Sequence, residues 1–239
     1  MRRWKMITLE NLQKTYPAAH GENSPAPVLR GVLVNIEKGD FVAIMGKSGC
    51  GKSTLLNILG CLDDYTGGRY LLYGKEVAAF NSKQKARARS KTFGFVFQSF
   101  HLLASETVLD NVKLPLRYSD IPKKDYDKVA LSTLESLGIA HLSSKYPSAL
   151  SGGEQQRAAI ARALVNSPDV ILADEPTGNL DSDTGKLIMK TLTRLHEEAA
   201  KTIILVTHDV KIASYADKLI EMRDGVIANC FSCKKGGEC

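Results

Sequence analysis

The sequence predicts an α/β fold built around a parallel β-sheet, and three observations point to it. The apolar run 41–45 stops at a glycine-rich turn, 46–51, and a segment with helical character follows at once. Two further runs rich in β-branched residues, 170–173 and 203–206, are each followed by polar residues. Buried parallel strands have near-continuous apolar sequences and present functional groups at their carboxyl ends. We therefore expect these runs to be central parallel strands.

The other elements follow along the chain. Residues 6–46 have the composition of strands, interrupted between 17 and 27 by an exposed loop rich in proline and small polar residues. A strand and turn are expected at 67–73. The basic run 83–91 is typical of a solvated helix face. A helix is expected over 125–137, where apolar residues recur at helical spacing and a glycine follows as the expected C-cap.

Length and composition are those of an ordinary globular protein. The chain has 239 residues, of which 44% are hydrophobic and 24% charged, which excludes a disordered, collagen-like or disulfide-scaffold chain. The net charge of +6 suits nucleic acid, anionic lipid or phosphate-bearing ligands alike. No stretch approaches the roughly 18 apolar residues of a membrane-spanning helix, and the basic start lacks a secretory apolar segment. We expect a cytosolic chain whose five cysteines are reduced.

The segment 46–53 matches the pattern G-x-x-x-x-G-K-[ST]. Its glycines let backbone N–H groups face a phosphate chain, and the helix that follows adds its positive dipole end. Lys52 can bridge the β- and γ-phosphates, and the Ser53 hydroxyl can ligate Mg²⁺. An incidental tight turn is the alternative, but the strand before and the helix after favour a nucleotide site. Its expected binding residues are Gly46, Ser48, Gly49, Cys50, Gly51, Lys52, Ser53 and Thr54.

Two carboxylates, Asp174 and Glu175, follow the apolar run 170–173. A Mg²⁺–nucleotide site needs one carboxylate near the metal, and hydrolysis needs a second to orient and polarise the attacking water. Asp174 suits the first role and Glu175 the second. Alone, such a pair is more often a helix N-cap or a solvated turn, and the glycine-rich loop is what favours the functional interpretation.

A second helix start follows Leu150. Ser151 and Glu154 have the spacing of a capping box, but a capping box does not require Gly152 and Gly153. Two missing side chains allow a ligand close to the helix N-terminus. The chain therefore has two candidate anion sites. One chain could fold both onto one nucleotide, or two chains could share two nucleotides head to tail, and the spacing leaves both arrangements open.

These residues together resemble the ATP-binding cassette (ABC) ATPases, from about residue 6 to about residue 228. The run 150–155 is similar to the family's signature sequence, which is far more specific than the glycine-rich loop. Other segments that match the family occur in the right order. They are 94–98, which ends in the lid glutamine Gln98; 180–181, with the dimer-crossing Asp181; and 207–209, with the switch histidine His208. Tyr16 stands where the family places an aromatic ring against adenine.

The resemblance implies a P-loop NTPase (RecA-like) core with a parallel sheet, an antiparallel β subdomain, and a helical subdomain, about residues 99–165, that carries the signature. The cassette would cover 6–228 and a cysteine-containing tail 229–239. The implied catalytic residues are Glu175, His208 and Gln98; the implied nucleotide contacts add Tyr16, Ser151, Gly152, Gly153 and Asp181; the implied metal ligands are Ser53, Gln98 and Asp174.

The resemblance also implies the larger machine. ATP and Mg²⁺ would be bound between two copies arranged head to tail, and a separate membrane permease would contact the region near Gln98 on the inner face of the membrane. Stretches such as 57–63 and 172–178 are similar to the macrolide-export and lipoprotein-release type, so exported antimicrobial peptides, drugs or lipoproteins are expected. The alternative is an ATPase of a non-transporting cell-division or peptide-sensing complex. No nucleic-acid partner is expected, because no aromatics interleave the basic residues.

The cysteines at the end of the chain depart from what the family leads us to expect. Cys230, Cys233 and Cys239 include a C-x-x-C pair, but a closed tetrahedral zinc site needs four ligands. A reduced tail is therefore favoured over a soft-metal site. Cys50 is favoured as a small side chain that fits its loop, with redox sensitivity as the alternative.

Overall fold

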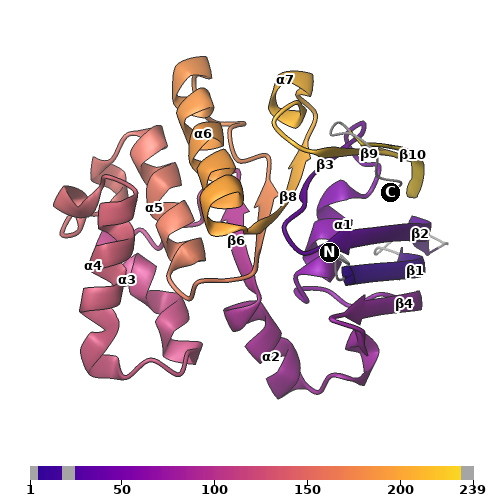
Figure 1. Ribbon diagram of the computed structural model, residues 1–239, viewed down its shortest axis with the longest axis horizontal. Helices are drawn as coiled ribbons and strands as arrows, with labels where there is room; N and C mark the ends of the chain where they lie inside the picture. Colours follow the sequence, from indigo (N-terminus) through magenta and orange to yellow (C-terminus); the bar gives the residue numbers. More distant parts are fainter. Residues whose placement is uncertain (1–4, 18–24, 233–239) are drawn as a thin grey trace. The chain divides into compact units, whose positions relative to one another are not determined.

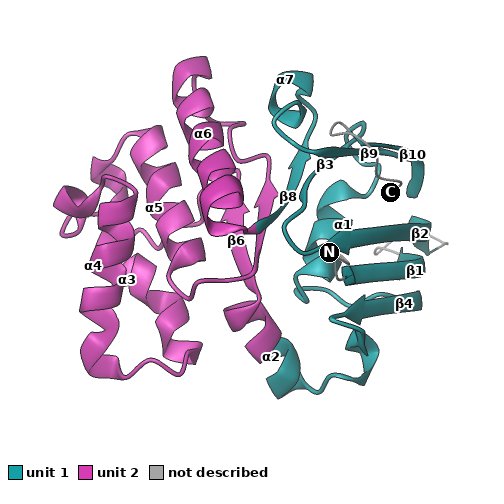
Figure 2. Ribbon diagram, viewed as in Figure 1, with its two compact units in different colours: residues 1–86, 202–239 teal, residues 87–201 magenta. Residues whose placement is uncertain are grey.

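The parallel strands predicted around the glycine-rich loop are present in the computed structural model, which describes residues 5–17 and 25–232. The chain divides into two compact units, residues 1–86 with 202–239 and residues 87–201 (Figure 2). Each unit is described by itself. The predicted α/β class is confirmed, with parallel strands, an antiparallel sheet and helices all present.

The first unit contains an antiparallel sheet and a group of parallel strands. The antiparallel sheet has the order β2-β1-β4-β5. The parallel strands β8 and β9 lie on either side of β3, and β10 pairs antiparallel with β9. The bounds of these elements are β1 Lys5–Tyr16, β2 Ala26–Glu37, β3 Phe41–Met45, α1 Lys52–Leu59, β4 Gly67–Leu72, β5 Lys75–Glu76, η1 Val77–Ala79, β8 Thr202–Thr207, α7 Val210–Ala213, β9 Lys218–Arg223 and β10 Val226–Ser232.

The second unit is mainly helical. Strands β6 and β7 pair in parallel, with Phe97 opposite Asp174, and helices α3, α4 and α5 pack against one another (Figure 1). The bounds are β6 Phe93–Phe97, α3 Val108–Lys113, η2 Leu114–Tyr118, η3 Lys123–Asp125, α4 Tyr126–Ser136, η4 Ala140–Leu142, η5 Pro147–Ala149, α5 Gly152–Leu164, β7 Val170–Asp174 and α6 Ser182–Ala199. Helix α2, Ser82–Lys91, crosses the boundary between the units.

The central strands are buried as their sequences predict. Residues 41–44 of β3 and all six residues of β8 are buried, as are the first four residues of β7. The predicted helix 125–137 is observed as α4, and Gly138 follows it with a φ of +70°, as a C-terminal glycine should. None of the helices described here is long and apolar enough to cross a membrane.

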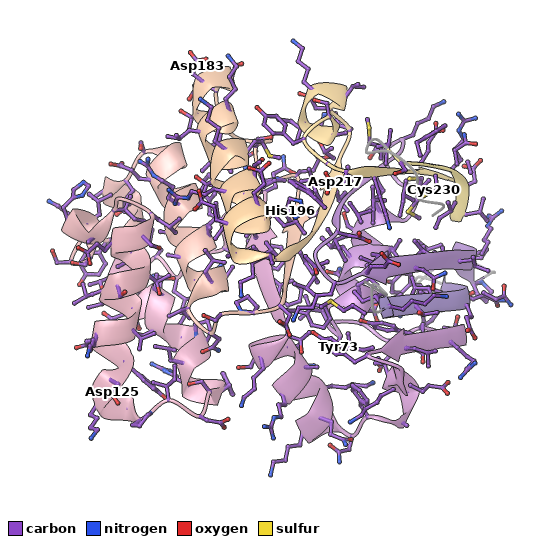
Figure 3. All side chains as sticks on the ribbon, in the orientation of Figure 1. Tyr73, Asp125, Asp183, His196, Asp217 and Cys230 are labelled. Atoms are coloured by element: carbon purple, nitrogen blue, oxygen red, sulfur yellow. The ribbon has the colours of Figure 1, made fainter. Side chains whose placement is uncertain are left out.

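The end of the chain differs from expectation in two respects. Cys50 and Cys61 are buried thiols outside disulfide bonds, whereas Cys230 is disulfide-bonded (labelled in Figure 3) and not reduced as expected. Residues 229–232, expected in the tail, form the second half of β10. Cys233 and Cys239 lie outside the described residues.

In the first unit, a buried ion pair joins the N-terminal ends of the parallel strands β3 and β9. Asp40, just before β3, is 3% exposed and accepts a hydrogen bond of 2.9 Å from Lys218 Nζ on β9. The same carboxylate oxygen accepts a 2.8 Å bond from the Glu37 N–H. Removing one member of such a pair leaves the other charge buried, which costs far more than losing an exposed pair.

We expect Lys218→Met to lower the free energy of unfolding by about 3 kcal/mol, because Asp40 would remain buried without its cation. Urea denaturation monitored by circular dichroism measures the loss. The matched control is Lys186→Met, which breaks an exposed ion pair with Asp183 and should cost about 0.5 kcal/mol or less. Equal losses of unfolding free energy in the two variants would contradict the conclusion that the buried pair is worth more than the exposed one.

Candidate functional site

The glycine-rich turn connects β3 to α1 in the first unit. Gly49 and Gly51 have φ values of +80° and +102°, which side-chain-bearing residues rarely adopt. A Cβ on Gly46 would lie 2.4 Å from the Met222 carbonyl oxygen, and one on Gly51 would lie 3.0 Å from that of Val28. The glycines are therefore required both by the conformation of the turn and by the backbone that packs against it.

Lys52, the first residue of α1, is folded back into this turn. Its Nζ donates to the carbonyl oxygens of Gly46 at 2.8 Å and Lys47 at 3.0 Å, and the residue is buried. No side chain caps the N-terminus of α1, where Gly51 is the N-cap residue. An ammonium group and a helix N-terminus without a side-chain cap therefore meet at one turn, which is the arrangement that binds phosphate groups.

Two residues of the turn and one at the start of α1 differ in exposure. Ser48 and Ser53 are exposed, whereas Cys50 is only 7% exposed. The Cys50 carbonyl accepts a hydrogen bond from the Gly225 N–H at 3.2 Å, and its Sγ lies 2.6 Å from where a Gly46 Cβ would stand. Cys50 is thus a packed side chain within the turn, and Ser53 presents its hydroxyl at the surface.

A polar cluster surrounds Tyr16 at the end of β1. The Tyr16 hydroxyl donates to Asp63 Oδ2 and Lys14 Nζ donates to Asp63 Oδ1, both at 2.6 Å. Lys14 Nζ also lies 4.4 Å from the centroid of the Tyr16 ring. The hydrogen bond to Asp63, followed by burial, raises the pKa of Tyr16. Burial opposes ionisation of Asp63, but hydrogen bonds from Lys14 and Tyr16 outweigh it and lower the pKa of the carboxyl.

The switch histidine predicted at the end of β8 lies beside the glycine-rich turn. His208 is exposed and follows Thr207, whose hydroxyl accepts the Asp209 N–H at 3.1 Å. It lines a cavity of about 530 Å³ together with Met45, Gly46, Lys47, Leu219, Glu221 and Phe231. The first unit therefore brings His208 and the glycine-rich turn to one cavity.

In the second unit, Gln98 follows β6 and is bound to the Asn179 side chain through its backbone carbonyl and its side-chain amide. The Asn179 Nδ2 donates to the Gln98 carbonyl at 3.0 Å, and the Gln98 Nε2 donates to Asn179 Oδ1 at 3.3 Å. A Cβ on Gly178 would lie 2.7 Å from Gln98 Nε2. The sequence did not identify Asn179, because an Asn in a polar turn is unremarkable until the fold places it against Gln98.

The turn that follows Gln98 contains two residues with positive φ, and an arginine side chain binds their carbonyl groups. Phe100 and His101 both have positive φ, +59° and +49°, which is strained for residues of this size. Arg162 on α5 donates from Nη2 to the Phe100 carbonyl at 2.8 Å and from Nη1 to the His101 carbonyl. Burial lowers the pKa of the Arg162 guanidinium. This arginine, which the sequence did not identify, holds the turn in place.

The acidic pair lies at the carboxyl end of β7. Asp174 is the last residue of the strand and Glu175 has a φ of +45°. The Glu175 carbonyl accepts the Gly178 N–H at 3.0 Å, and the buried Gln156 donates to the Pro176 carbonyl at 2.6 Å. The left-handed backbone at Glu175 breaks the extended conformation directly after Asp174, so the strand ends between the two acidic residues.

The predicted capping box at the start of α5 is confirmed. The Glu154 N–H donates to Ser151 Oγ at 3.4 Å, and the Ser151 N–H donates to Glu154 Oε2 at 2.8 Å, which completes the capping box. The Ser151 hydroxyl also donates to Glu154 Oε2 at 2.7 Å. The two bonds that the Glu154 carboxylate accepts lower its pKa. The neighbouring glycines have a role within the chain as well: a Cβ on Gly153 would lie 2.4 Å from Thr184 Cγ2 of α6. Close packing of α5 on α6 is thus one reason for Gly153, independent of any ligand.

Asp181 is the N-cap residue of α6. Its Oδ1 accepts the N–H groups of Asp183 at 3.1 Å and Thr184 at 3.0 Å, and these bonds, from Thr184 first, lower its pKa. Figure 3 shows Asp183 at the N-terminal end of the helix. The carboxylate of Asp181 is exposed, so capping leaves it at the surface, where a second chain can reach it.

An apolar groove of about 300 Å³ lies beside the Gln98 turn, entirely within the second unit. Its lining residues are Arg89, Ser90, Phe93, Gly94, Phe95, Phe97, His101, Pro115, Arg162, Ala163 and Asn166. Phe97 and His101, whose ring centroids are 4.8 Å apart, bracket the turn that carries Gln98. The groove and Gln98 therefore share a supporting segment.

We expect Gly153→Ala to lower the free energy of unfolding by about 1–2 kcal/mol, because the new methyl group would collide with Thr184 Cγ2. The matched second change is Thr184→Ser, which removes that methyl group, so the double variant should recover most of the loss. Chemical denaturation of the four proteins measures the coupling. Additive losses, with no recovery in the double variant, would contradict the packing argument.

Comparison with known proteins agrees with the resemblance seen in the sequence. A family model described as ABC transporter matches residues 29–178. The macrolide export ATP-binding/permease protein MacB of Brucella melitensis is 48% identical over 222 residues, covering 93% of this chain and 34% of that protein. MacB of Chlorobaculum tepidum is 50% identical (94% and 34%), and the pyoverdine export ATP-binding/permease protein PvdT of Pseudomonas fluorescens is 47% identical (93% and 33%). The chain thus spans about a third of the length of these relatives.

Solved structures of ABC cassettes also match this chain, over nearly its whole length. The dimeric post-hydrolysis state of the ATP-binding cassette MJ0796, bound to ADP and Pi, matches with a TM-score of 0.88 and 40% identity, covering 97% of this chain and 100% of that one. CbiO1 of Clostridium perfringens, part of the ABC transporter complex cbiONQ, matches with a TM-score of 0.82 and 31% identity, covering 97% and 90%. The chain therefore belongs to the ABC transporter family, as an ATP-binding cassette ATPase.

Proposed function

We propose that this cassette binds Mg–ATP, pairs head to tail with a second copy, and uses hydrolysis to drive a membrane permease. The observation that carries the proposal is the glycine-rich turn with Lys52 seated inside it, at the N-terminus of α1, which no side chain caps. Phosphate groups are the ligands that such a turn recognises. His208 on the adjoining cavity is the second supporting feature.

The residues of the first unit would bind the nucleotide. Lys52 neutralises charge on the phosphates, while backbone N–H groups of residues 46–54 surround the phosphate chain. These include Gly46, Ser48, Gly49, Cys50, Gly51 and Thr54, whose contributions come largely from the backbone. Tyr16 stacks on the adenine base. His208 donates a hydrogen bond to the terminal phosphate and so fixes its orientation.

The donor set also suits Mg²⁺, a hard cation that prefers oxygen ligands. Ser53, Asp174 and Gln98 offer a hydroxyl, a carboxylate and an amide oxygen, and the Gln98 side chain is held by Asn179 rather than moving freely. Together these three would hold the ion, which when bound supplies positive charge against the phosphate oxygens. Glu175 accepts the proton of the attacking water as general base.

A second copy of the chain would complete each site. Ser151, Gly152 and Gly153 at the start of α5 form a helix N-terminus suited to the terminal phosphate bound by the other copy, and the exposed Asp181 lies at the proposed crossing between copies. The MJ0796 structures are dimeric, which supports the pairing of two copies. Of the two arrangements that the spacing left open, we propose the head-to-tail one.

A permease is the proposed mechanical partner, and the apolar groove beside the Gln98 turn is where a permease segment would insert. The relatives support this, since each is named as an ATP-binding/permease protein. The cassette would then lie on the cytoplasmic face of the membrane. Exported antimicrobial peptides, drugs or lipoproteins remain the proposed cargo, in keeping with relatives named for macrolide and pyoverdine export.

The alternative is a complex that uses the same ATP cycle for cell division or peptide sensing without moving a solute. Vesicles that contain the cassette and its permease separate the two functions. ATP-dependent movement of a solute across the vesicle membrane supports export. Hydrolysis that responds to a peptide without any solute movement supports the alternative.

We expect Glu175→Gln to abolish steady-state hydrolysis while preserving ATP-dependent dimerisation, because the amide retains the shape of the carboxylate but accepts no proton. Phosphate release measures turnover, and size-exclusion chromatography with ATP measures dimerisation. The control is Glu198→Gln, at an exposed position of α6, which should change neither. Normal hydrolysis in the Glu175 variant would contradict its role as the base.

A further inference from the structure

The cluster around Tyr16 has more contacts than a surface tyrosine needs. Lys14 and Tyr16 are two residues apart on β1, and Asp63 lies in the segment after α1, so one carboxylate binds both β1 side chains. Lys14 Nζ donates a further 2.6 Å bond to the Asp64 carbonyl. The ammonium group therefore has two oxygen acceptors and the Tyr16 ring around it.

Lys14 and Asp63 are largely shielded from solvent, so water weakens their contacts less than it would at an exposed position. The Lys14 side chain is 9% exposed and that of Asp63 is 27% exposed. The segment that carries Asp63 is also joined to β1 through its backbone, since the Thr66 N–H donates to the Gln13 carbonyl at 2.8 Å and the Thr15 N–H donates to Thr66 Oγ1 at 3.1 Å. Asp63 is thus a fixed anchor for the phenol and not a mobile surface carboxylate.

The geometry restricts the ring in two ways. A hydrogen bond at the hydroxyl fixes the far end of the side chain, and an ammonium group at 4.4 Å from the centroid occupies one face. A cation over an aromatic face is attracted by the ring quadrupole, whose face is its negative side. A flat ligand therefore has one ring face left to stack on, and it meets a ring whose orientation is already set, which removes an entropic cost of binding.

We propose that Lys14 and Asp63 are positioning residues that hold Tyr16 as a platform for the adenine base, which stacks on the ring face opposite Lys14. This inference rests on the proposed function, because it assumes that Tyr16 contacts the base of bound ATP. Neither residue touches the phosphates in this arrangement. Their effect is therefore confined to the base, and a ligand made of phosphates alone should not sense them.

The experiment compares ATP with inorganic tripolyphosphate, both in the presence of Mg²⁺. The test variants are Asp63→Asn, which keeps the size of the side chain but weakens its bonds, Lys14→Met, and Tyr16→Phe, which keeps the ring but loses the tether. Each should raise the KM for ATP about fivefold to tenfold, as expected for a loosened stacking contact. The kcat and the inhibition constant of tripolyphosphate should stay unchanged.

The matched control is Asp64→Asn. Its carboxylate is 79% exposed and pairs with Lys85, whereas its contact with Lys14 uses only the backbone carbonyl. This variant should leave the KM unchanged. The double variant Tyr16→Phe with Asp63→Asn should raise the KM no more than the larger single change, because the two changes act on the same hydrogen bond, which one removes and the other weakens.

Each other outcome contradicts the inference in a recognisable way. An unchanged KM in all three variants would show that Tyr16 needs no positioning. A parallel rise in the KM for ATP and in the inhibition constant of tripolyphosphate would show a general effect on the fold. If Asp63→Asn fails to fold, Tyr16→Phe still provides the test. Absence of ATP hydrolysis by the unmodified protein would instead contradict the proposed function itself.

Discussion

Close packing of backbone against backbone around the glycine-rich turn is the constraint on which the first unit depends. Three segments that are far apart in the sequence meet there: the turn itself, the start of β2, and the turn between β9 and β10. A Cβ on Gly225 would lie 2.4 Å from the Val28 carbonyl oxygen, and the Arg30 N–H donates to the Gly225 carbonyl at 2.8 Å. Because these segments approach one another through backbone atoms as well as the Leu29 and Cys50 side chains, a change in the turn would also move the neighbouring strands.

In the second unit, side chains of a helix hold the turns that carry candidate site residues. These turns contain side-chain-bearing residues with positive φ, including Phe100 and Glu175, and such conformations persist only where the surroundings enforce them. Here the enforcing groups come from α5: Arg162 binds the carbonyls of the turn after Gln98, and Gln156 binds the Pro176 carbonyl after Glu175. One helix therefore supports both turns, and the same helix begins at the capping box.

The features that could be predicted from the sequence are local ones. The glycine-rich turn and the capping box each depend on residues within eight positions of one another, so their spacing alone indicates the geometry. The features that could not be predicted join distant positions: Asp63 with Tyr16, Asn179 with Gln98, and Gly153 with Thr184. Gly153 is instructive, because its small size suggested a ligand, whereas the fold supplies a neighbouring helix that already requires it.

The two helix N-termini are not equivalent as anion sites. At α1 the N-cap residue is Gly51, no side chain caps the helix, and an ammonium group is already present. At α5 the hydroxyl and N–H of Ser151 both donate to the Glu154 carboxylate, so an incoming phosphate competes with a negative charge for the same donors. We therefore expect an anion to bind at α1 before α5. This difference fits the proposed cycle, in which a single chain first binds the nucleotide at α1, and α5 of a second copy contacts the phosphate only after the two copies close.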